Sequence, residues 1–236
     1  MAVEFSKYRQ RGAYHWREVS RHPLRGWSYT RSRVAWVVRA CGASRRVLEI
    51  GCGDAAILGQ LARQGKTVTG VDSDATALEL ARGIFSAQGL TGAFHAELSA
   101  VAGQRFDTVV LAEVLEHVDE PDALLATIAG LLEPGGRLVL TTPIRLLERP
   151  LDVHHVHEFW PEELRSLLAR HFAEARVEKL HPAWFVDLCA LGFLGFQPFS
   201  VLANLVKLVT GIELIDRVPS PLGLYWTQGW VVVKPQ

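Results

Sequence analysis

The sequence predicts an α/β fold in which a seven-stranded, mostly parallel sheet carries helices on both faces. Short apolar runs alternate with amphipathic segments from residue 47 onward, and a glycine-rich turn follows the first of these runs. The chain has 236 residues, of which 49% are hydrophobic, so one sizeable core can form. Strands that alternate with helices indicate a parallel sheet, because parallel neighbours need a crossover connection that a helix supplies.

The expected elements follow one another in a regular order. The strands are expected at 47–50, 67–71, 92–96, 106–112, 137–142, 173–180 and 224–233, and the helices between or before them at 30–42, 54–64, 74–88, 120–132 and 162–170. Helical spacing of apolar residues supports the second helix, where Ile57, Leu58 and Leu61 share one face. Gly42 suits a helix end and Pro161 a helix start.

We expect one domain over residues 1–236. It consists of an N-terminal helical extension (1–46), a core (47–180), a hydrophobic helical insertion (181–222) and a last strand (223–236). The insertion contains two apolar segments, 184–195 and 199–210, joined at Gln197-Pro198. A proline at this place would break a membrane-spanning helix. The segments are therefore interpreted as a buried layer, a substrate lid or a patch that contacts a membrane surface.

The charge and the cysteines restrict the class of protein. Lys and Arg number 25, as do Asp and Glu, so a strongly basic nucleic-acid binder is not the default interpretation. Residues 1–46 nevertheless hold eleven Lys and Arg against Glu4 and Glu18, which is typical of a segment facing an anion or membrane, or of a solvated helix face. The cysteines (Cys41, Cys52 and Cys189) are odd in number and far apart, which favours a reducing, cytoplasmic location. No apolar run follows the N-terminal charges, so no secretory signal is expected.

The glycine-rich turn lies between the first strand and its helix. Gly51 and Gly53 let the backbone turn tightly and approach a ligand, and Asp72 ends the next strand, where an acid can accept hydrogen bonds from ribose hydroxyls. The spacing also fits a dinucleotide site. However, Glu49 would repel a pyrophosphate and attract an ammonium group, and Asp54 stands at the helix start where a phosphate would bind.

Further segments extend this pattern. They are Val47–Ala56, Val68–Asp72, Phe106–Val110, Glu113–Val118 and Leu132–Gly136. With these segments in this order and spacing, the chain resembles class I S-adenosylmethionine-dependent methyltransferases over about residues 47–180. The resemblance implies a Rossmann-like fold, S-adenosyl-L-methionine as cofactor and S-adenosyl-L-homocysteine as product.

The resemblance also implies a role for each matching position. Glu49 would hold the amino group of the cofactor, and Gly51 and Gly53 would border its methionine part. Asp72 would bind the ribose hydroxyls and Ser73 would pack beside them, while Glu97 and the backbone N–H of Leu98 would contact the adenine. Ala112 and Glu113 would close the methionine side of the site.

Two histidines are candidates for the chemistry. Methyl transfer to oxygen benefits from a base, and His117 and His154 are the catalytic candidates, the alternative being a structural histidine. If Glu113 starts a helical turn, then Glu113, Glu116 and His117 share one face. With later imidazoles they could bind a divalent metal. This resembles the metal constellation of the small-RNA 3′-terminal 2′-O-methyltransferases, which His157 matches by spacing, and the ubiquinone-pathway O-methyltransferases, which His154 matches.

The leading hypothesis is an O-methyltransferase for a small apolar or aromatic acceptor. It rests on the apolar insertion and its aromatic residues Trp184, Phe185, Phe193, Phe196 and Phe199. Methylation at nitrogen or carbon stays open, as do peripheral membrane contact and the oligomeric state. The rival hypotheses are metal-assisted RNA 2′-O-methylation, weakened by the zero net charge, and a non-catalytic cofactor-binding or interaction protein of the same fold.

Overall fold

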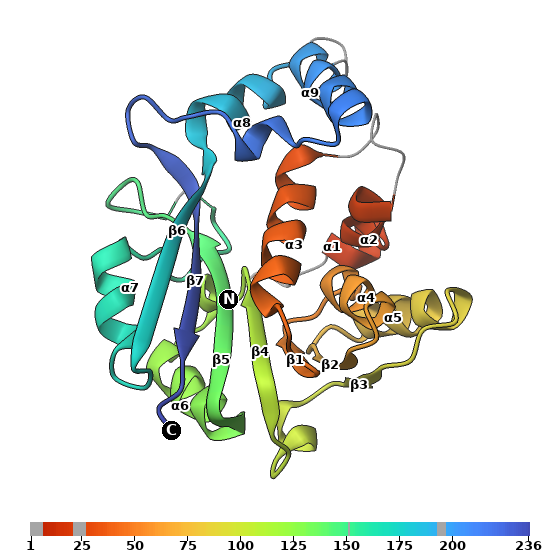
Figure 1. The fold of residues 1–236 in the computed structure, drawn as a ribbon, viewed down its shortest axis with the longest axis vertical. Helices are drawn as coiled ribbons and strands as arrows, with labels where there is room; N and C mark the ends of the chain where they lie inside the picture. The colour runs from red at the N-terminus through yellow and green to blue at the C-terminus, as the bar shows by residue number, and fades with distance from the viewer. Residues whose placement is uncertain (1–6, 21–26, 151, 193–196) are drawn as a thin grey trace.

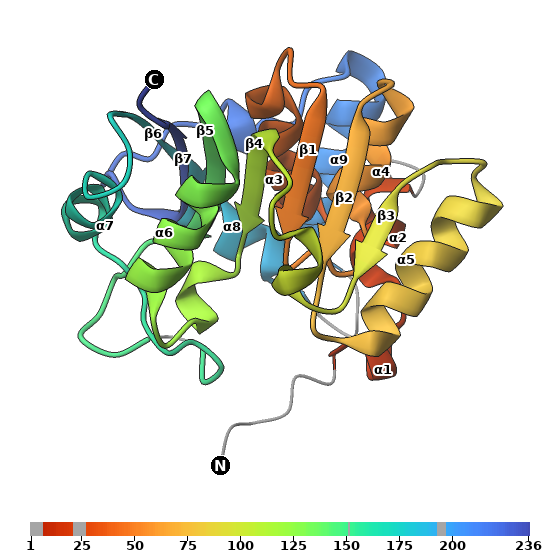
Figure 2. The same cartoon turned by 90° about the horizontal axis from the view of Figure 1, so that it is seen from below.

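A seven-stranded sheet forms the centre of the computed structural model, which describes residues 7–20, 27–150, 152–192 and 197–236 (Figure 1). The strands are β1 (Arg46–Ile50), β2 (Thr67–Val71), β3 (Ala93–His95), β4 (Phe106–Ala112), β5 (Leu132–Pro143), β6 (Glu174–Pro182) and β7 (Tyr225–Val233). Their spatial order, β3-β2-β1-β4-β5-β7-β6, can be followed from right to left in Figure 2. β7 runs antiparallel to both of its neighbours, and the pairings among β1 to β5 are parallel. The prediction of a mostly parallel, seven-stranded sheet is confirmed.

The helices connect the strands as expected. They are α1 (Lys7–Arg11), α2 (Tyr14–Ser20), α3 (Ser28–Cys41), α4 (Ala56–Arg63), α5 (Ala75–Ala87), α6 (Pro121–Leu131), α7 (Pro161–Leu168), α8 (Ala183–Ala190) and α9 (Pro198–Thr210), with 3₁₀ helices η2 (Leu98–Val101), η3 (Leu115–His117) and η4 (Leu214–Asp216). The carboxylate of Asp74 caps α5 by accepting the backbone N–H groups of Thr76 and Ala77.

The sheet separates two hydrophobic clusters. Successive side chains of a strand point to opposite faces, so Val47 of β1 packs with α3, α4 and α5 while Leu48 packs with α6 and α7. Both side chains are fully buried. This two-sided burial explains why the central strands are continuous apolar runs rather than alternating ones.

The N-terminal extension is helical, as predicted, and besides α3 it contains two short helices for which the sequence pattern gave no bounds. Tyr8 of α1 and Trp16 of α2 are buried, and their side chains lie against Gly53 and Gly59, where an added Cβ atom would overlap them. The backbone N–H of Trp16 also donates to the carboxylate of Asp54 at 3.0 Å. Tertiary contacts with the glycine-rich turn and α4 therefore hold these helices in place.

The apolar insertion forms α8 and α9, which lie together at the top of Figure 1, beside the start of α3. The two predicted segments are thus helical, but α8 ends at Ala190 rather than near residue 195. Phe193 and Phe196 lie outside the described residues, as do Glu4 and the basic Arg21 and Arg25. Within the described part of the chain, none of the helices combines the length and apolar character that crossing a bilayer requires.

The contact between α2 and α4 predicts opposite effects for two glycine-to-alanine changes. Gly59→Ala should destabilise the fold because the new methyl group overlaps the Trp16 ring. Gly83→Ala in α5 is the matched control, because no atom lies within 4 Å of its added Cβ, and it should stabilise the fold by about 1 kcal/mol through helix propensity. Urea denaturation followed by tryptophan fluorescence measures both changes. Equal stabilisation by the two would contradict the packing of α2 on α4.

Candidate functional site

The carboxyl ends of β1, β2 and β4 meet where the glycine-rich turn begins. Gly51 and Gly53 adopt φ angles of 72° and 52°, a left-handed backbone that glycine adopts at little cost. A Cβ atom on Gly51 would overlap the side chain of Val114, and one on Gly53 would overlap the hydroxyl of Tyr8. The turn therefore requires glycine at both positions, for backbone conformation and for space.

Three carboxyl groups gather at this turn. Glu49 is 2% exposed and Asp54 is fully buried, while Asp72 is half-buried at the end of β2. Asp72 accepts hydrogen bonds from the backbone N–H groups of Gly53 at 2.7 Å and Asp74 at 2.9 Å. Glu49 Oε2 and Asp54 Oδ1 are buried without a hydrogen-bond partner. Buried acceptors of this kind are costly unless a ligand satisfies them.

The electrostatics of this group favour a cationic ligand. Burial raises the pKa of Glu49 well above its ordinary value, and the neighbouring Asp54 and Asp72 raise it further. Burial also raises the pKa of Asp54 to about 6 and the pKa of Asp72 above its usual range. Among the described residues, none of the three carboxylates forms a salt bridge. The group therefore fits an ammonium and a sulfonium, as in the predicted cofactor, and would repel a phosphate.

The residues predicted to contact adenine lie farther along the same edge. Glu97 follows β3, is exposed, and accepts a hydrogen bond from the Ser99 hydroxyl at 3.0 Å. Leu98 begins η2, and Ser73 is exposed directly after Asp72. Their roles toward the cofactor stay predictions.

Glu113 departs from the expected helical turn. Ala112 ends β4, and Glu113 then adopts a left-handed conformation with φ of 56°. Its carboxylate forms a salt bridge at 3.0 Å with Arg33 of α3, and its backbone N–H donates to the carbonyl of Thr141. Glu113 therefore does not start the expected helical turn, because its φ is positive and the following 3₁₀ helix begins only at Leu115.

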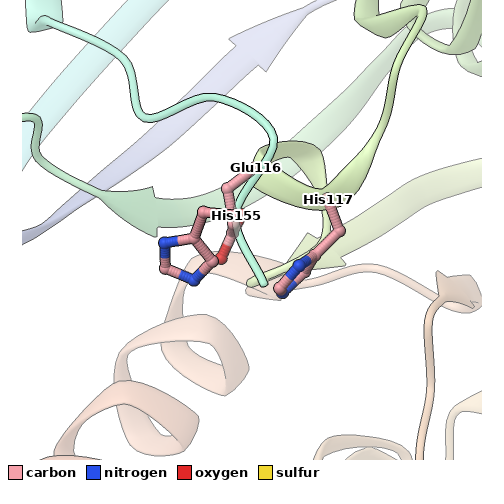
Figure 3. A group of neighbouring side chains, drawn as sticks. All are labelled: Glu116, His117 and His155. Atoms are coloured by element: carbon pink, nitrogen blue, oxygen red, sulfur yellow. The ribbon is translucent and has the colours of Figure 1, made fainter. Parts of the chain in front are cut away.

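A cluster of Glu116, His117 and His155 forms instead (Figure 3). One potential ligand atom of each residue lies within 4.8 Å of the other two. The two imidazole rings make an edge contact with centroids 5.0 Å apart. Glu116 is buried and accepts a hydrogen bond from the hydroxyl of Thr142 at 3.0 Å. Burial and the nearby Glu113 raise the pKa of Glu116 well above its ordinary value.

The hydrogen bonds of the two rings define where their lone pairs lie. His117 Nδ1–H donates to the backbone carbonyl of His154 at 2.8 Å, and His155 Nδ1–H donates to the carboxylate of Glu158 at 2.7 Å. With Nδ1 engaged as a donor, the lone pair of either ring in its neutral form lies on Nε2. Burial lowers the pKa of His117 below its ordinary value.

His155 was not among the predicted residues. His154 contributes its carbonyl to the cluster, and His157 instead bonds to Glu163 at 2.7 Å. Three histidines within four positions offer the same chemistry, so only the path of the loop after β5 decides which imidazole reaches His117. The catalytic role of the His154 side chain stays a prediction.

A cavity of about 1100 Å³ lies beside this cluster, between the N-terminal helices and the loop after β5. Its lining includes aromatic, cationic and acidic side chains, among them Tyr14, Trp27, Tyr29, Trp226, Lys7, Arg33, Asp152, His155, Glu158 and Val186. His155 thus connects the cluster with the cavity, and Val186 of α8 makes the insertion part of its wall. Tyr29 and Trp226 had no sequence signal of a site, because they come from distant segments that only the fold brings together.

The fold and this site define an α/β protein with an acidic, glycine-rich turn at the carboxyl ends of its parallel strands, and comparison with known proteins identifies the family. The methyltransferase domain family matches residues 16–181, and the chain therefore belongs to it. The predicted membership of the class I S-adenosylmethionine-dependent methyltransferases and the predicted Rossmann-like fold are confirmed.

Two similar curated proteins illustrate the relationship. The ubiquinone biosynthesis O-methyltransferase of Aromatoleum aromaticum (strain DSM 19018 / LMG 30748 / EbN1) is 37% identical over 115 residues, which are 47% of this chain and 49% of that protein. The mitochondrial ubiquinone biosynthesis O-methyltransferase of Schizosaccharomyces pombe is 37% identical over 121 residues, which are 49% of this chain and 44% of that protein. The match therefore spans about half the length of these relatives.

Solved structures share the fold at low identity. The N-methyltransferase NodS from Bradyrhizobium japonicum WM9, in complex with S-adenosyl-L-homocysteine, superposes with a TM-score of 0.60 at 19% identity and covers 95% of this chain and 99% of its own. Phosphoethanolamine N-methyltransferase 2 of Haemonchus contortus, in complex with S-adenosyl-L-methionine, has a TM-score of 0.65 at 17% identity, with coverages of 99% and 60%. The [4+2]-cyclase SpnF has a TM-score of 0.60 at 15% identity, with coverages of 87% and 81%.

The burial of Asp54 predicts that the free energy of unfolding depends on pH. Its pKa is raised from 3.8 to about 6, so between these values the folded protein holds a proton that the unfolded chain has released, and stability falls as pH rises. Asp54→Asn removes this loss, so the unfolding free energy of the variant relative to the parent should grow by about 2 kcal/mol from pH 4 to pH 7. Urea denaturation across this range measures it, with the exposed Asp119→Asn as control. A constant difference for Asp54→Asn would contradict the burial of a charge-prone carboxyl.

Proposed function

We propose that this chain transfers the methyl group of S-adenosyl-L-methionine to an oxygen atom of a small apolar or aromatic acceptor. The observation that carries the proposal is the pairing of two neighbouring features. One is the group of carboxyls around Glu49, which suits a cationic cofactor, and the other is the aromatic-lined cavity that reaches the histidine cluster through His155. The curated relatives that match are named O-methyltransferases, which supports oxygen as the acceptor atom.

The cofactor supplies an activated methyl group with its own leaving group, so the protein mainly aligns the acceptor. Glu49 and Asp54 offer acceptor oxygens for the ammonium, and Asp72 offers its carboxylate to the ribose hydroxyls. The aromatic wall of the cavity, with Tyr29 and Trp226, holds the acceptor by apolar contact and excludes water. His117 receives the acceptor's proton on Nε2, because its Nδ1–H is committed to the carbonyl of His154.

A divalent cation is the second proposal for the same cluster. One carboxylate and two imidazole nitrogens from Glu116, His117 and His155 form a set that borderline metals such as Zn²⁺ accept. The cation would orient the acceptor oxygen and lower its pKa. In that case His117 would be a ligand and not the base, so the two proposals for His117 exclude each other.

Other functions have weaker support. RNA 2′-O-methylation would need an open basic surface, whereas the net charge is zero and the cavity lining mixes cations with Asp152 and Glu158. A different activity on this fold stays an alternative, because the [4+2]-cyclase SpnF shares the architecture and carries the name of another reaction.

Peripheral membrane contact and the cytoplasmic location also stay predictions. The membrane contact is supported by a set of exposed apolar side chains on or next to α8 and α9, namely Trp184, Leu191, Phe199, Leu202, Leu205, Leu208, Val209 and Ile212. Such a surface is typical of an interfacial contact or of an association with another protein. Co-sedimentation with lipid vesicles distinguishes the two.

Removal of the ribose-binding carboxylate should abolish tight cofactor binding. Asp72→Ala is expected to weaken binding of S-adenosyl-L-homocysteine at least about tenfold, because the ribose hydroxyls lose a charged acceptor. Isothermal titration calorimetry measures this, and circular dichroism checks the fold. Asp119→Ala, on the exposed surface, is the control and should bind as the parent does. Unchanged binding by Asp72→Ala would refute the assigned role.

Substitution of the proposed base should affect turnover but not cofactor binding. His117→Ala is expected to lower kcat about a hundredfold or more while the Kd for S-adenosyl-L-homocysteine stays the same. The control is His171→Ala, which removes an imidazole bonded to Asp122 away from the cavity. If activity survives in His117→Ala, His117 is not the base.

Metal removal separates the two proposals for the cluster. A base at His117 predicts turnover that is unchanged after dialysis against EDTA. A bound cation predicts loss of turnover with EDTA, recovery with Zn²⁺ or Mg²⁺, and about one equivalent of metal by elemental analysis. Full activity in metal-free protein would eliminate the metal-assisted mechanism.

A further inference from the structure

His181 stands in an unusual conformation at the end of β6. Its φ angle is 60°, a left-handed value that costs energy for residues other than glycine, and its side chain is 2% exposed. In the described part of the chain, only Ala55 and Glu113 share this property among the non-glycine residues. Those two lie at the glycine-rich turn and at the end of β4. His181 is therefore a third strained position, located on the acceptor side of the molecule.

The imidazole of His181 connects two hydroxyl groups on opposite sides of its ring. Nδ1 lies 3.0 Å from the hydroxyl oxygen of Thr227, and Nε2 lies 3.2 Å from the hydroxyl oxygen of Ser32. The Thr227 hydroxyl lies 2.8 Å from that of Tyr29, and the Ser32 hydroxyl donates to the carboxylate of Asp216. Five side chains from α3, β6, β7 and η4 thus form one continuous chain of hydrogen bonds.

The proton positions along this chain follow from the acceptor at its end. Ser32 has one hydroxyl proton, which it gives to Asp216, so its oxygen accepts from His181 Nε2–H. The lone pair on Nδ1 then accepts the hydroxyl proton of Thr227. Thr227 in turn accepts the hydroxyl proton of Tyr29. Every hydroxyl donates once, and His181 is neutral with its proton on Nε2.

Burial supports this neutral arrangement at both ionisable rings. Desolvation lowers the pKa of His181 to about 3 and raises the pKa of Tyr29 to about 12. The two rings are also in direct contact, with centroids 4.3 Å apart. Packing and hydrogen bonding therefore restrict Tyr29 in both position and rotation.

Tyr29 lies between this chain and the reaction site. Its ring lines the cavity, and the guanidinium of Arg33 lies 5.5 Å from the ring centroid. Arg33 forms the salt bridge with Glu113 at the end of β4. A continuous series of contacts therefore connects Asp216, in the segment after α9, with the carboxyl end of β4, which lies beside the glycine-rich turn. The hydrogen-bonded side chains that begin at Asp216 therefore connect the insertion with the wall of the cavity at Tyr29.

We propose that His181 is a positioning residue that holds Tyr29 as a wall of the acceptor cavity, with the hydroxyl proton of Tyr29 directed at Thr227 and not at the acceptor. The wall then presents an aromatic ring without a free donor, which selects for an acceptor with an apolar, aromatic face in contact with it. This inference rests on the proposed function and specifies its substrate class.

Two variants test the chain without removing the ring of Tyr29. Thr227→Val keeps the side-chain shape and deletes the central hydroxyl. His181→Asn keeps a residue that tolerates a left-handed backbone but is too short to reach both hydroxyls. Since 4-hexylcatechol is aromatic, apolar and carries the hydroxyl to be methylated, it serves as the probe acceptor. His171→Asn, which breaks the bond to Asp122 away from the cavity, is the matched control.

Each test variant should raise the KM for 4-hexylcatechol about five- to tenfold, with kcat within about twofold and the Kd for S-adenosyl-L-homocysteine unchanged. The double variant should be no worse than either single one, because both break the same chain. The control should match the parent. An unchanged KM in folded test variants, or full additivity, would overturn the positioning role.

Histidine ¹⁵N NMR gives a readout that needs no activity. His181 should show a protonated Nε2 and an unprotonated Nδ1 at every pH from 5.5 to 8, and Thr227→Val should disturb the Nδ1 signal. Protonation at Nδ1, or titration of His181 near its ordinary pKa, would overturn the proposal. If the parent protein neither binds nor methylates 4-hexylcatechol while the NMR result holds, the proposed function fails and the hydrogen-bond chain stands.

Discussion

The site depends on carboxyl groups that the fold holds together at the end of β1. Glu49 lies on a central strand with its side chain buried, Asp54 lies under α2, and neither has all of its acceptor oxygens satisfied. Desolvation and mutual repulsion make this arrangement unfavourable in the isolated protein. A ligand that brings positive charge and N–H donors relieves both costs. On physical grounds, this edge would therefore favour a cationic ligand over a phosphate-rich one.

The remaining structure surrounds that edge from two sides. On one side, α1 and α2 pack on the glycine-rich turn and α4 through Tyr8 and Trp16. On the other side, the insertion contributes Val186 to the cavity wall and is connected to α3 by the bond between Arg31 and Glu213 at 2.8 Å. The family match ends at residue 181, so α8 and α9 lie beyond the matched region.

The sequence was informative where local pattern and burial agree. The strands Thr67–Val71 and Phe106–Ala112 were predicted to the residue, because buried parallel strands are apolar runs bounded by polar residues. The N-terminal extension was predicted to be helical, but the bounds of α1 and α2 were not, since these helices are short and are held by contacts with a distant turn. Likewise, the pairing of Arg33 with Glu113 and the choice of His155 depend on approaches between segments far apart in sequence, which no local spacing encodes.

The most direct test of the cationic site is the number of protons released when S-adenosyl-L-methionine binds at pH 6, obtained from calorimetry in buffers of different ionisation enthalpy. The amino group of the ligand is already protonated at this pH. Burial and the neighbouring acids raise the pKa of Glu49, and burial raises the pKa of Asp54 to about 6, whereas an ammonium group beside them favours the ionised carboxylates. Binding should therefore release protons from this group. Binding without proton release, or tighter binding of a dinucleotide at the same site, would contradict a site built for a cation.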